Sequence, residues 1–566
     1  MFNNRNRTII VVIFCSLLFI YLFYTLFKLQ ISQHENYKNI RNVQNQFDSQ
    51  VNKRGTIYGT RKDGELVSLA QDDVWYKLVI APKNIDLSYE ERLYSLLNDI
   101  TPIDKDTFLA KCANKKDSYE VIKVINKSEA EQVEKLSLQG VFTYKDFKRQ
   151  YPLKEIGSRI IGFVGGGDSG YVGRYGLEKY YEDDLNSKES INTTFFSKIF
   201  SDDSTDHSQE YSKNIVTSLE PNVMKFLNKT LMDMKNDWEA DEVSAIIMDP
   251  QTGEILAMDT VPGFDPNDYK NADIKNFGNP SVQGVYELGS IMKPITMSGG
   301  IEAGLVTPET YYRDYGFVKI DNYTIKNFDE KVRGDQTMQD VISNSLNTGA
   351  VFVEKLLGKE KFKQNFIKFG LEDQTGIDFP GEVINKTDNL DTNTEVNFAT
   401  AAFGQGVAIT PISMLSSLSV IANDGKSMCP HFLESKVLYD GSKINYECEN
   451  EQKEVISTTT ARTMKGMLVE LIDTGLAHGR YKDKNYKVAA KTGTAQLPSP
   501  DGKYYKDKFV HSYFTFFPAE NPKFAVLIYQ VNPKKGQLAS LTLSPPATST
   551  KKKLNFNLIN LNLKTS

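Results

Sequence analysis

An uncharged, almost wholly apolar segment near the N-terminus places the strongest constraint on how this chain can fold. The segment runs from Thr8 to Phe27. A helix of that length, at about 1.5 Å per residue, crosses the roughly 30 Å hydrocarbon core of a bilayer. A cleaved signal peptide is the alternative, but its apolar region is usually about 7–15 residues long and small residues follow it. Here Lys28 and Glu35 follow, so we predict an uncleaved transmembrane anchor over residues 8–28.

The charges beside this segment predict its orientation. Arg5 and Arg7 precede it without any acidic residue, and basic flanks stay on the cytoplasmic side of a membrane. We therefore expect residues 1–7 to form a cytoplasmic tail of a single-pass protein. The bulk of the chain should then lie outside the membrane.

The composition excludes several functional classes and names no activity. The chain has 566 residues and a formal net charge of −5. Nucleic-acid-binding proteins usually carry a basic field, so we expect no nucleic-acid partner. The histidines never fall at metal-ligand spacing, and the four cysteines are too few for a disulfide framework or a zinc cluster. The length exceeds the roughly 250–300 residues of one hydrophobic core and predicts more than one domain.

Two cysteines leave an alternative open. Cys429 and Cys448 flank a predicted strand pair around Asp440. A disulfide between them can form in an oxidising compartment, whereas Cys112 has no evident partner. The sequence does not decide between a disulfide and two thiols.

Residues 29–210 predict a first extramembrane domain of mixed helices and strands. Residues 86–100 and 128–138 have the apolar spacing of amphipathic helices. Ser128 and Glu131 predict a capping box at the start of the second helix.

Two further stretches predict segments without regular structure. Residues 165–176 are glycine-rich, but no Gly-Lys-Ser/Thr follows, so a flexible loop is favoured over a phosphate-binding loop. Residues 186–212 are rich in Ser, Asp and Asn and predict a linker or a mobile insertion.

Residues 211–535 predict a second domain built around an antiparallel sheet. Apolar runs at 243–248 and 254–258 flank a Pro-Gln-Thr-Gly turn and predict an opening hairpin. Runs at 511–517 and 523–531 predict the strands that close the sheet. Helical patterns lie between these pairs, which indicates a mixed α/β domain with helices flanking the sheet.

Three short motifs occur in order within this second domain. They are Ser290-Ile-Met-Lys293, Ser345-Leu-Asn347 and Lys491-Thr-Gly493. Each is weak alone, because Ser-x-x-Lys occurs again by chance from Ser549 to Lys552. The hypothesis of a catalytic site therefore depends on their order, separation and context together.

The first motif has the chemistry of an activated serine. A serine hydroxyl needs an adjacent base to act as a nucleophile, and positions three apart share a helix face, so Lys293 can reach Ser290. A lysine becomes a base when burial and a second cation lower its pKa, and Lys491 can supply that charge. A helix that starts at Ser290 also leaves its backbone N–H free as an oxyanion donor.

The other two motifs can complete such a site. Ser345 and Asn347 project together from a turn or an extended segment, so a hydroxyl can relay a proton and an amide can hold the lysine and a substrate carbonyl. Gly493 predicts a strand edge that a substrate backbone can approach closely. Thr492 and Thr494 can bind a terminal carboxylate.

Together the motifs resemble those of penicillin-binding proteins and class A β-lactamases. Longer segments are similar to class B penicillin-binding proteins, which are monofunctional peptidoglycan D,D-transpeptidases. The segments are Asp249-Pro-Gln-Thr-Gly-Glu-Ile-Leu-Ala257, Tyr286-Glu-Leu-Gly-Ser-Ile-Met-Lys-Pro294, Phe403-Gly-Gln-Gly406 with Thr410-Pro411, Arg54-Gly-Thr-Ile57, Arg149-Gln-Tyr-Pro152 and Gly176-Leu-Glu178. The resemblance covers residues 1–535.

This resemblance implies an α/β protein of the bacterial cell membrane. We expect the transmembrane helix at 8–28, an elongated α+β pedestal (dimerisation-like) domain at 29–210, and a penicillin-binding/β-lactamase-like transpeptidase domain at 211–535. Residues 536–566 form an atypical C-terminal tail, because the family continues past Asn532 through a glycine-rich turn, a strand and a helix.

The resemblance also implies a reaction on a peptidoglycan stem peptide that ends in D-Ala-D-Ala. Neutral Lys293 takes the proton of Ser290, which attacks the penultimate carbonyl, and the backbone N–H groups of Ser290 and Thr494 hold the oxyanion. Ser345 passes a proton to the leaving D-alanine, and an amine of a neighbouring strand captures the acyl group. β-Lactams should acylate Ser290, no metal or organic cofactor is implied, and a membrane-embedded glycan polymerase is the implied partner.

Two further departures from the family pattern lie elsewhere, one beside the first motif and one in the N-terminal domain. Leu288 stands where the family usually has proline, and the loop at residues 59–64 is looser than the family's. We expect neither to disturb the three motifs.

Three other functions remain open from the sequence. A β-lactam sensor would need more transmembrane segments or a cytoplasmic signalling domain. The short cytoplasmic tail expected here counts against it. A β-lactamase needs a deacylating water with its base and usually no pedestal. An inactive scaffold would not need to keep all three motifs.

Overall fold

A computed structural model describes most of the chain outside its two ends. The described residues are 16–19, 21–23, 54–116, 119–167, 170–186, 212–438, 440–448, 453–475 and 485–535. Residues 16–19 and 21–23 are helical, and the rest of the predicted anchor lies outside the described residues, as do nearly all of the predicted linker and the tail. Within the described residues, no helix is long and apolar enough to cross a bilayer.

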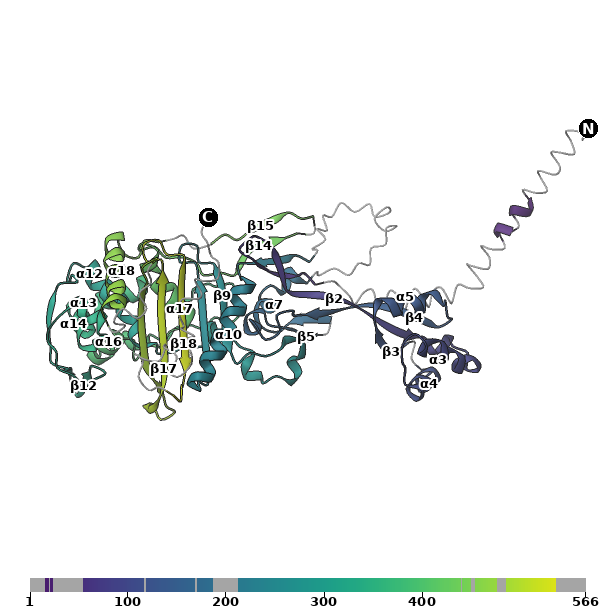
Figure 1. The fold of residues 1–566 in the computed structure, drawn as a ribbon, viewed down its shortest axis with the longest axis horizontal. Helices are drawn as coiled ribbons and strands as arrows, with labels where there is room; N and C mark the ends of the chain where they lie inside the picture. The colour runs from purple at the N-terminus through teal and green to yellow at the C-terminus, as the bar shows by residue number, and fades with distance from the viewer. Residues whose placement is uncertain are drawn as a thin grey trace, which may run out of the picture.

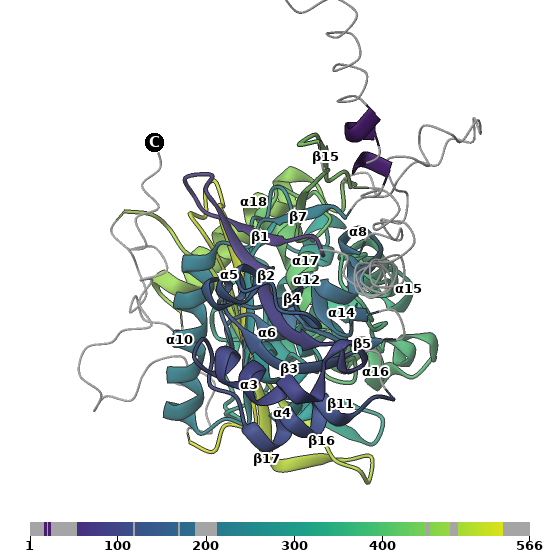
Figure 2. The same ribbon diagram turned by 90° about the vertical axis from the view of Figure 1, so that its right-hand side faces the viewer.

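The described chain forms an elongated molecule with a small head and a larger body (Figure 1). We call residues 76–148 the head and the other described residues from 54 to 535 the body. Strand β2 (Leu66–Ile80) and strand β4 (Val141–Gln150) run from one into the other. Figure 2 views the molecule from the head side, with β2 and β4 in front of the body.

The head is a three-stranded sheet with helices on one face. Strands β3 (Glu120–Ile125) and β4 both pair antiparallel with β2. The helical elements are η2 (Pro82–Asn84), η3 (Leu87–Tyr89), α3 (Glu90–Asn98), α4 (Lys105–Ala113) and α5 (Lys127–Lys135). They enclose a separate hydrophobic core, with Leu78, Leu97 and Phe108 fully buried.

Both helices predicted in the head are present, but the predicted capping box is wrong. Helix α5 begins one residue earlier, and Asn126 rather than Ser128 is its N-cap. Asn126 Oδ1 accepts from the backbone N–H of Glu129, and the Glu129 carboxylate accepts from the N–H of Asn126. The same reciprocal pattern is therefore shifted by two residues, because asparagine caps a helix as well as serine does.

A seven-stranded sheet joins the head to strands far along the chain. Its order is β15-β14-β7-β1-β2-β3, with β4 also paired to β2. The strands outside the head are β1 (Ile57–Thr60), β7 (Asn214–Thr217), β14 (Leu433–Val437) and β15 (Lys443–Asn445). Strand β7 lies parallel to β1 and antiparallel to β14, so residues on both sides of position 210 share one sheet.

The open question about the cysteines has an answer in this sheet. A disulfide joins Cys429 to Cys448 across the predicted strand pair, now seen as the β14–β15 hairpin. Cys112 is a buried free cysteine in the head.

A buried cluster of charges explains why three N-terminal motifs resemble the family's. Glu178 is fully buried and accepts from Arg54 Nε and Arg149 Nε, both at 2.7 Å. Arg149 also pairs with Asp72 on β2 at 3.1 Å. The two guanidinium groups lower the pKa of Glu178 against the opposing effect of burial. The cluster therefore fixes β1, β2, β4 and helix α7 (Gly176–Tyr180) to one another.

The glycine-rich stretch is not the flexible loop that the sequence predicted. Strands β5 (Val164–Gly167) and β6 (Gly170–Gly173) pair as an antiparallel hairpin that leads into α7. A Cβ at Gly173 or Gly162 would approach neighbouring backbone atoms to about 2 Å or less: 2.1 Å from Glu178 O and 1.9 Å from Tyr175 O. The glycines thus permit close backbone packing. A high glycine content alone does not distinguish such packing from a flexible loop.

The body contains a five-stranded sheet of order β16-β17-β18-β8-β9. Its strands are β8 (Glu242–Met248), β9 (Ile255–Val261), β16 (Ala489–Pro498), β17 (Tyr504–Phe517) and β18 (Phe524–Val531). All neighbours are antiparallel, so the predicted opening and closing strands are confirmed. Strand β16, which carries the third motif, lies at one edge.

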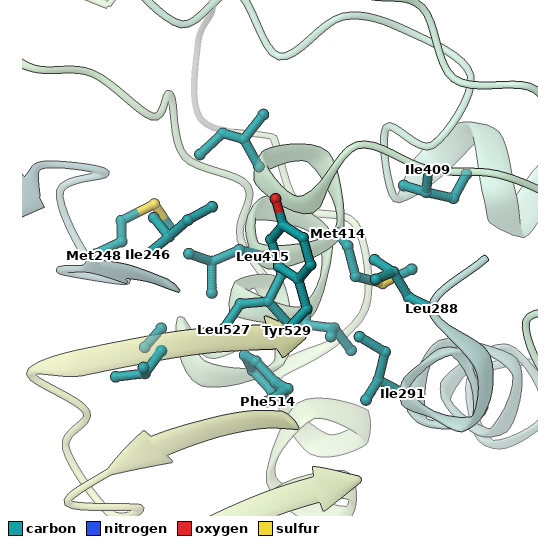
Figure 3. Packing of buried hydrophobic residues seen from close by; sticks show 14 of the residues in the cluster. Ile246, Met248, Leu288, Ile291, Ile409, Met414, Leu415, Phe514, Leu527 and Tyr529 are labelled. Carbon is teal, nitrogen blue, oxygen red and sulfur yellow. The ribbon is translucent and has the colours of Figure 1, made fainter. Parts of the chain in front are cut away.

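Helices cover both faces of this sheet. Helix α10 (Pro221–Trp238) packs against β8 and β9 on the outer face. It begins with proline in its first turn, a common start signal, and the Glu220 carboxylate at its N-cap accepts from the N–H of Val223. On the inner face, α17 (Pro411–Ala422) contributes Met414 and Leu415 to the core around Tyr529 (Figure 3).

The remaining elements surround the inner face and the pedestal junction. The helices are α6 (Ser158–Ile161), α8 (Glu182–Leu185), α11 (Pro280–Gln283), α12 (Lys293–Glu302), α13 (Met338–Ser343), α14 (Asn347–Leu357), α15 (Lys359–Lys368), α16 (Glu395–Ala401) and α18 (Thr458–Asp473). The 3₁₀ turns are η4 (Pro266–Asn271), η5 (Ile274–Asn276), η6 (Gly289–Met292) and η7 (Asp388–Asp391). Short strand pairs are β10 (Tyr311–Asp314) with β13 (Gly334–Thr337) and β11 (Phe317–Ile320) with β12 (Tyr323–Lys326).

Candidate active site

Ser290 lies in the 3₁₀ turn η6, immediately before helix α12. Gly289 has φ +63°, which a residue with a side chain rarely adopts. A Cβ there would also lie 2.3 Å from the carbonyl oxygen of Thr494. Glycine at 289 therefore lets the nucleophile turn approach the backbone of β16.

Lys293 begins α12 and turns its amine back to Ser290. Its Nζ lies 2.8 Å from Ser290 Oγ, 2.6 Å from Ser345 O and 2.8 Å from Asn347 Oδ1. Ser345 Oγ is slightly farther, at 3.1 Å. The two carbonyl-type oxygens can only accept, so they occupy two N–H bonds of a neutral amine. Its lone pair is then left for the hydroxyl proton of Ser290.

The electrostatics of the site favour that neutral amine. Lys293 is 1% exposed and Lys491 is fully buried. Burial lowers the pKa of Lys293 well below its usual value, and the neighbouring charge of Lys491 lowers it further. Burial alone lowers the pKa of Lys491 to about 7. Among the described residues, no ion pair offsets either charge.

Ser345 lies in the turn between α13 and α14 and has φ +56°. This left-handed conformation is strained for serine. Its hydroxyl accepts from Lys491 Nζ at 2.8 Å and also faces Lys293. Ser345 therefore connects the two lysines; its predicted role as a proton relay to the leaving amine stays a prediction.

Asn327, which the sequence analysis did not single out, holds the start of α14. Its Oδ1 accepts from the backbone N–H of Asn347 at 2.9 Å and of Thr348 at 3.2 Å. The buried carboxylate of Asp314 in turn accepts from Asn327 Nδ2 and from Thr348 Oγ1. No local spacing in the sequence reveals Asn327 and Asp314. Asn327 caps a helix that begins twenty residues later, and Asp314 acts through Asn327 and Thr348.

Strand β16 places Lys491 and Gly493 on the inner face of the sheet and Thr492 and Thr494 on the other. Other parts of the protein lie against Gly493, while the predicted close approach of a substrate backbone stays a prediction. A Cβ there would lie 2.3 Å from both Leu288 O and Ser512 Oγ. Ser512 donates to Leu288 O at 2.7 Å, so these contacts seat the nucleophile turn on β17.

Two polar atoms beside this strand have no partner among the described residues. Thr494 Oγ1 and His511 Nε2 are buried without a hydrogen bond. His511 faces Thr494 across the β16–β17 ladder, and burial lowers its pKa to about 4. The imidazole is therefore neutral at physiological pH, and the buried Thr494 hydroxyl has no partner among the described residues.

The protein-family comparisons match both parts of the chain. A penicillin binding protein transpeptidase domain model matches residues 243–549. A penicillin-binding protein dimerisation domain model matches residues 49–210.

Relatives with established names show the same similarity. The chain is 30% identical over 436 residues to stage V sporulation protein D of Bacillus subtilis, which covers 75% of this chain and 67% of that one. It is 26% identical over 570 residues to peptidoglycan D,D-transpeptidase FtsI of Buchnera aphidicola subsp. Baizongia pistaciae, which covers 97% and 94%. Penicillin-binding protein PbpB of Mycobacterium tuberculosis is 30% identical, and the match spans 50% of its length.

Solved structures share the fold. Penicillin binding protein 2X of Streptococcus thermophilus has a TM-score of 0.74 at 21% identity, with 87% of this chain and 78% of that one covered. Penicillin binding protein 3 of Mycobacterium tuberculosis, complexed with aztreonam, has a TM-score of 0.67 at 23% identity, with 87% and 94% covered. Along the chain, the match to the dimerisation domain precedes the match to the transpeptidase domain. Together the two matches show that the protein belongs to the class B penicillin-binding proteins.

Proposed function

We propose that the protein is a membrane-anchored serine D,D-transpeptidase that cross-links peptidoglycan stem peptides through an acyl-enzyme on Ser290. The observation that carries the proposal is the Lys293 amine, which lies within 3.1 Å of both the Ser290 and the Ser345 hydroxyls. Relatives that are named D,D-transpeptidases support the reaction type. Membership of the penicillin-binding proteins supports covalent binding of β-lactams to the same serine.

In the first half-reaction Ser290 is the nucleophile and Lys293 is the base. Neutral Lys293 accepts the hydroxyl proton while Ser290 Oγ bonds to the penultimate carbonyl carbon. The backbone N–H groups of Ser290 and Thr494 stabilise the oxyanion, which the close approach of Gly289 to Thr494 makes geometrically reasonable.

Collapse of this intermediate breaks the peptide bond to the terminal D-alanine. The leaving nitrogen takes a proton from the Ser345 hydroxyl, which is replenished from Lys293 through their 3.1 Å contact. Asn347 Oδ1 keeps Lys293 in place. Thr492 and Thr494 provide hydroxyls for the terminal carboxylate of the donor peptide, and Lys491, on the other face of β16, keeps the pKa of Lys293 low.

In the second half-reaction an amine of a neighbouring strand attacks the acyl-enzyme. The new amide bond forms as the ester bond to Ser290 breaks. Neutral Lys293 takes the proton that the attacking amine loses and returns it to Ser290 Oγ. We further propose that residues 8–28 anchor the enzyme in the bacterial cell membrane. There a membrane-embedded glycan polymerase would be its partner, contacted through the anchor and the pedestal.

Mass spectrometry of the purified protein with benzylpenicillin tests the proposal. A stable adduct on Ser290 that is absent from Ser290→Ala is the expected result. Rapid release of hydrolysed drug would indicate a β-lactamase instead. No adduct at all would indicate an inactive scaffold.

A further inference from the structure

A row of polar side chains crosses the catalytic sheet beside the proposed oxyanion hole. Thr494 on β16 lies opposite His511 on β17, and His511 lies opposite Gln530 on β18. Directly opposed residues project from the same face of a sheet. His511 is 2% exposed and Gln530 is 1% exposed, and the reaction steps above use neither of them.

Each member of this row has a buried polar atom without a hydrogen bond. The atoms are Thr494 Oγ1, His511 Nε2 and Gln530 Oε1, whereas the other such atoms of the described chain belong to three arginines and two serines elsewhere. A buried polar atom without a partner costs about 1–3 kcal/mol. An arrangement that pairs two of the three atoms is therefore favoured, and the row calls for a functional explanation.

The contact between Gln530 and His511 locates the proton of the imidazole. Gln530 Nε2 lies 3.3 Å from His511 Nδ1, and an amide nitrogen can only donate, so Nδ1 is the acceptor. Burial lowers the pKa of His511 to about 4, so the ring is neutral and carries its single proton on Nε2. The unpaired Nε2 is therefore a hydrogen-bond donor.

Thr494 and His511 form the kind of cross-strand pair in which side chains approach most closely. A Cβ at Gly289 would lie 2.3 Å from Thr494 O and 3.0 Å from Thr494 N. Both backbone groups of Thr494 therefore face the nucleophile turn and not β17. In such a non-hydrogen-bonded pair the Cα atoms are about 4.5 Å apart. At this position side chains, and not backbone hydrogen bonds, join β16 to β17.

The two unpaired groups of this pair can satisfy each other. His511 Nε2–H is a donor and Thr494 Oγ1 is an acceptor, and both are buried on the same face of the sheet. Hydrogen bonds that serve catalysis are often long or poorly aligned without substrate and tighten around the reacting group. An oxyanion on the Thr494 N–H would give this residue a fixed backbone position, which the bond to His511 can hold from the side-chain end.

We infer that His511 is a positioning residue for acylation, whose Nε2–H bonds to Thr494 Oγ1 when the oxyanion forms and so holds the Thr494 backbone N–H on the oxyanion. The inference rests on the proposed function and adds to it a residue that does not touch the substrate. Gln530 orients the imidazole, and Thr494 transmits the effect to the reacting group.

Two substitutions of His511 distinguish a hydrogen-bond donor from a side chain that only fills space. The amide of His511→Gln can occupy the position of Nε2, whereas the amide of His511→Asn reaches only the position of Nδ1. Stopped-flow labelling of the full-length protein in detergent with a fluorescent penicillin, over a range of concentrations, separates the dissociation constant of the first complex from the acylation rate constant.

The acylation rate constant should respond to these variants and the dissociation constant should not. Removing an oxyanion donor costs about 10²–10³-fold, and here the donor is displaced and not removed, so we expect His511→Asn to acylate about tenfold more slowly. His511→Gln should stay within about threefold of the wild type. The melting temperature of each variant shows that it is folded.

A double-mutant cycle shows whether the effect passes through Thr494. Thr494→Val keeps the shape of the side chain and removes the hydroxyl, so it should slow acylation by a similar factor even if the histidine variants fail to fold. In that background His511→Asn should cause no further loss. Thr515→Val is the matched control, because it removes a buried hydroxyl from the same face of β17, one that donates to Ala489 O, and it should leave acylation unchanged.

The outcomes separate the inference from the proposed function. Wild-type acylation by His511→Asn, equal losses in the Asn and Gln variants, or a further loss in the Thr494→Val background would each overturn the inference while Ser290 is still labelled. Failure of penicillin to label Ser290 in the wild type would overturn the proposed function, and the inference with it.

Discussion

At the scale of single residues, the site depends on two lysines buried without acidic partners. Lys293 must be neutral to accept the proton of Ser290, and Lys491 is most useful when it is charged. Burial lowers the pKa of both, and the charge of Lys491 lowers that of Lys293 further. The pair therefore separates into a base and a residual cation although the two side chains are chemically identical.

Replacing Lys293 by methionine should abolish the base while keeping the buried aliphatic chain. General-base catalysis contributes about 10²–10⁴-fold, so we expect the acylation rate constant with fluorescent penicillin to fall by at least about 100-fold. Stopped-flow labelling of Ser290 measures it. A rate within tenfold of the wild type, with an unchanged melting temperature, would mean that another group removes the proton.

Replacing Lys491 by methionine should stabilise the protein while impairing it. The pKa of Lys491 is about 7 in the folded protein and 10.5 in the unfolded chain. The unfolded state therefore binds more protons between these values, and the destabilisation caused by Lys491 is complete below pH 7 and absent above about pH 10.5. We expect Lys491→Met to gain up to about 5 kcal/mol at pH 6.

The measurement is the difference in melting temperature between Lys491→Met and the wild type as a function of pH. The difference should shrink steadily as the pH rises from 7 to 10. A difference that grows with pH, or stays constant, would contradict the assigned direction of the pKa shift.

At the scale of elements, the second motif is held by a cap from Asn327, the residue that follows strand β12. Asn327→Ala should leave the first N–H groups of α14 without a partner and cost about 1–2 kcal/mol of unfolding free energy. Asn347 and Ser345 would lose their fixed positions, so labelling of Ser290 should also slow, by about tenfold or more. Urea unfolding and penicillin labelling measure the two effects.

Thr337→Ala is the matched control for this prediction. Thr337 caps α13, with its hydroxyl accepting from the N–H of Asp340, but it does not contact Ser345 or Asn347. It should lower stability by a similar amount and slow labelling much less. If both variants slow labelling equally, the effect of Asn327 is general destabilisation and not positioning.

Local patterns in the sequence predicted elements better than they predicted how elements meet. The strands that open and close the catalytic sheet follow from apolar runs and turn residues. The glycines at 289 and 493 do not, because the atoms that approach them belong to residues far along the chain. The same holds for Asn327, whose side chain accepts from the backbone N–H of Asn347, twenty residues later. The family resemblance named the site residues, and the structure brings Ser290, Lys293, Ser345, Asn347 and Lys491 together, but their roles stay predictions.

At the scale of the whole molecule, the buried core does not follow one cut along the chain. The head has its own cluster of buried side chains. The other cluster includes pedestal residues such as Ile57, Tyr151 and Leu177 together with the catalytic domain. The base of the pedestal should therefore unfold with the catalytic domain, and the head should unfold separately. The predicted domain limits near residue 210 remain untested by this packing.

Two phenylalanines, both fully buried, test that division. Phe108 lies in the head on α4, and Phe362 lies in the body on α15. Truncating a buried phenylalanine to alanine costs about 3–5 kcal/mol. Phe108→Ala should lower only the calorimetric transition of the head and leave the temperature at which penicillin labelling of Ser290 is lost unchanged. Phe362→Ala should lower the second transition and that labelling temperature together. If Phe108→Ala lowers the labelling temperature as much as Phe362→Ala does, the head and the body unfold as one unit, because a separate core could not transmit that loss.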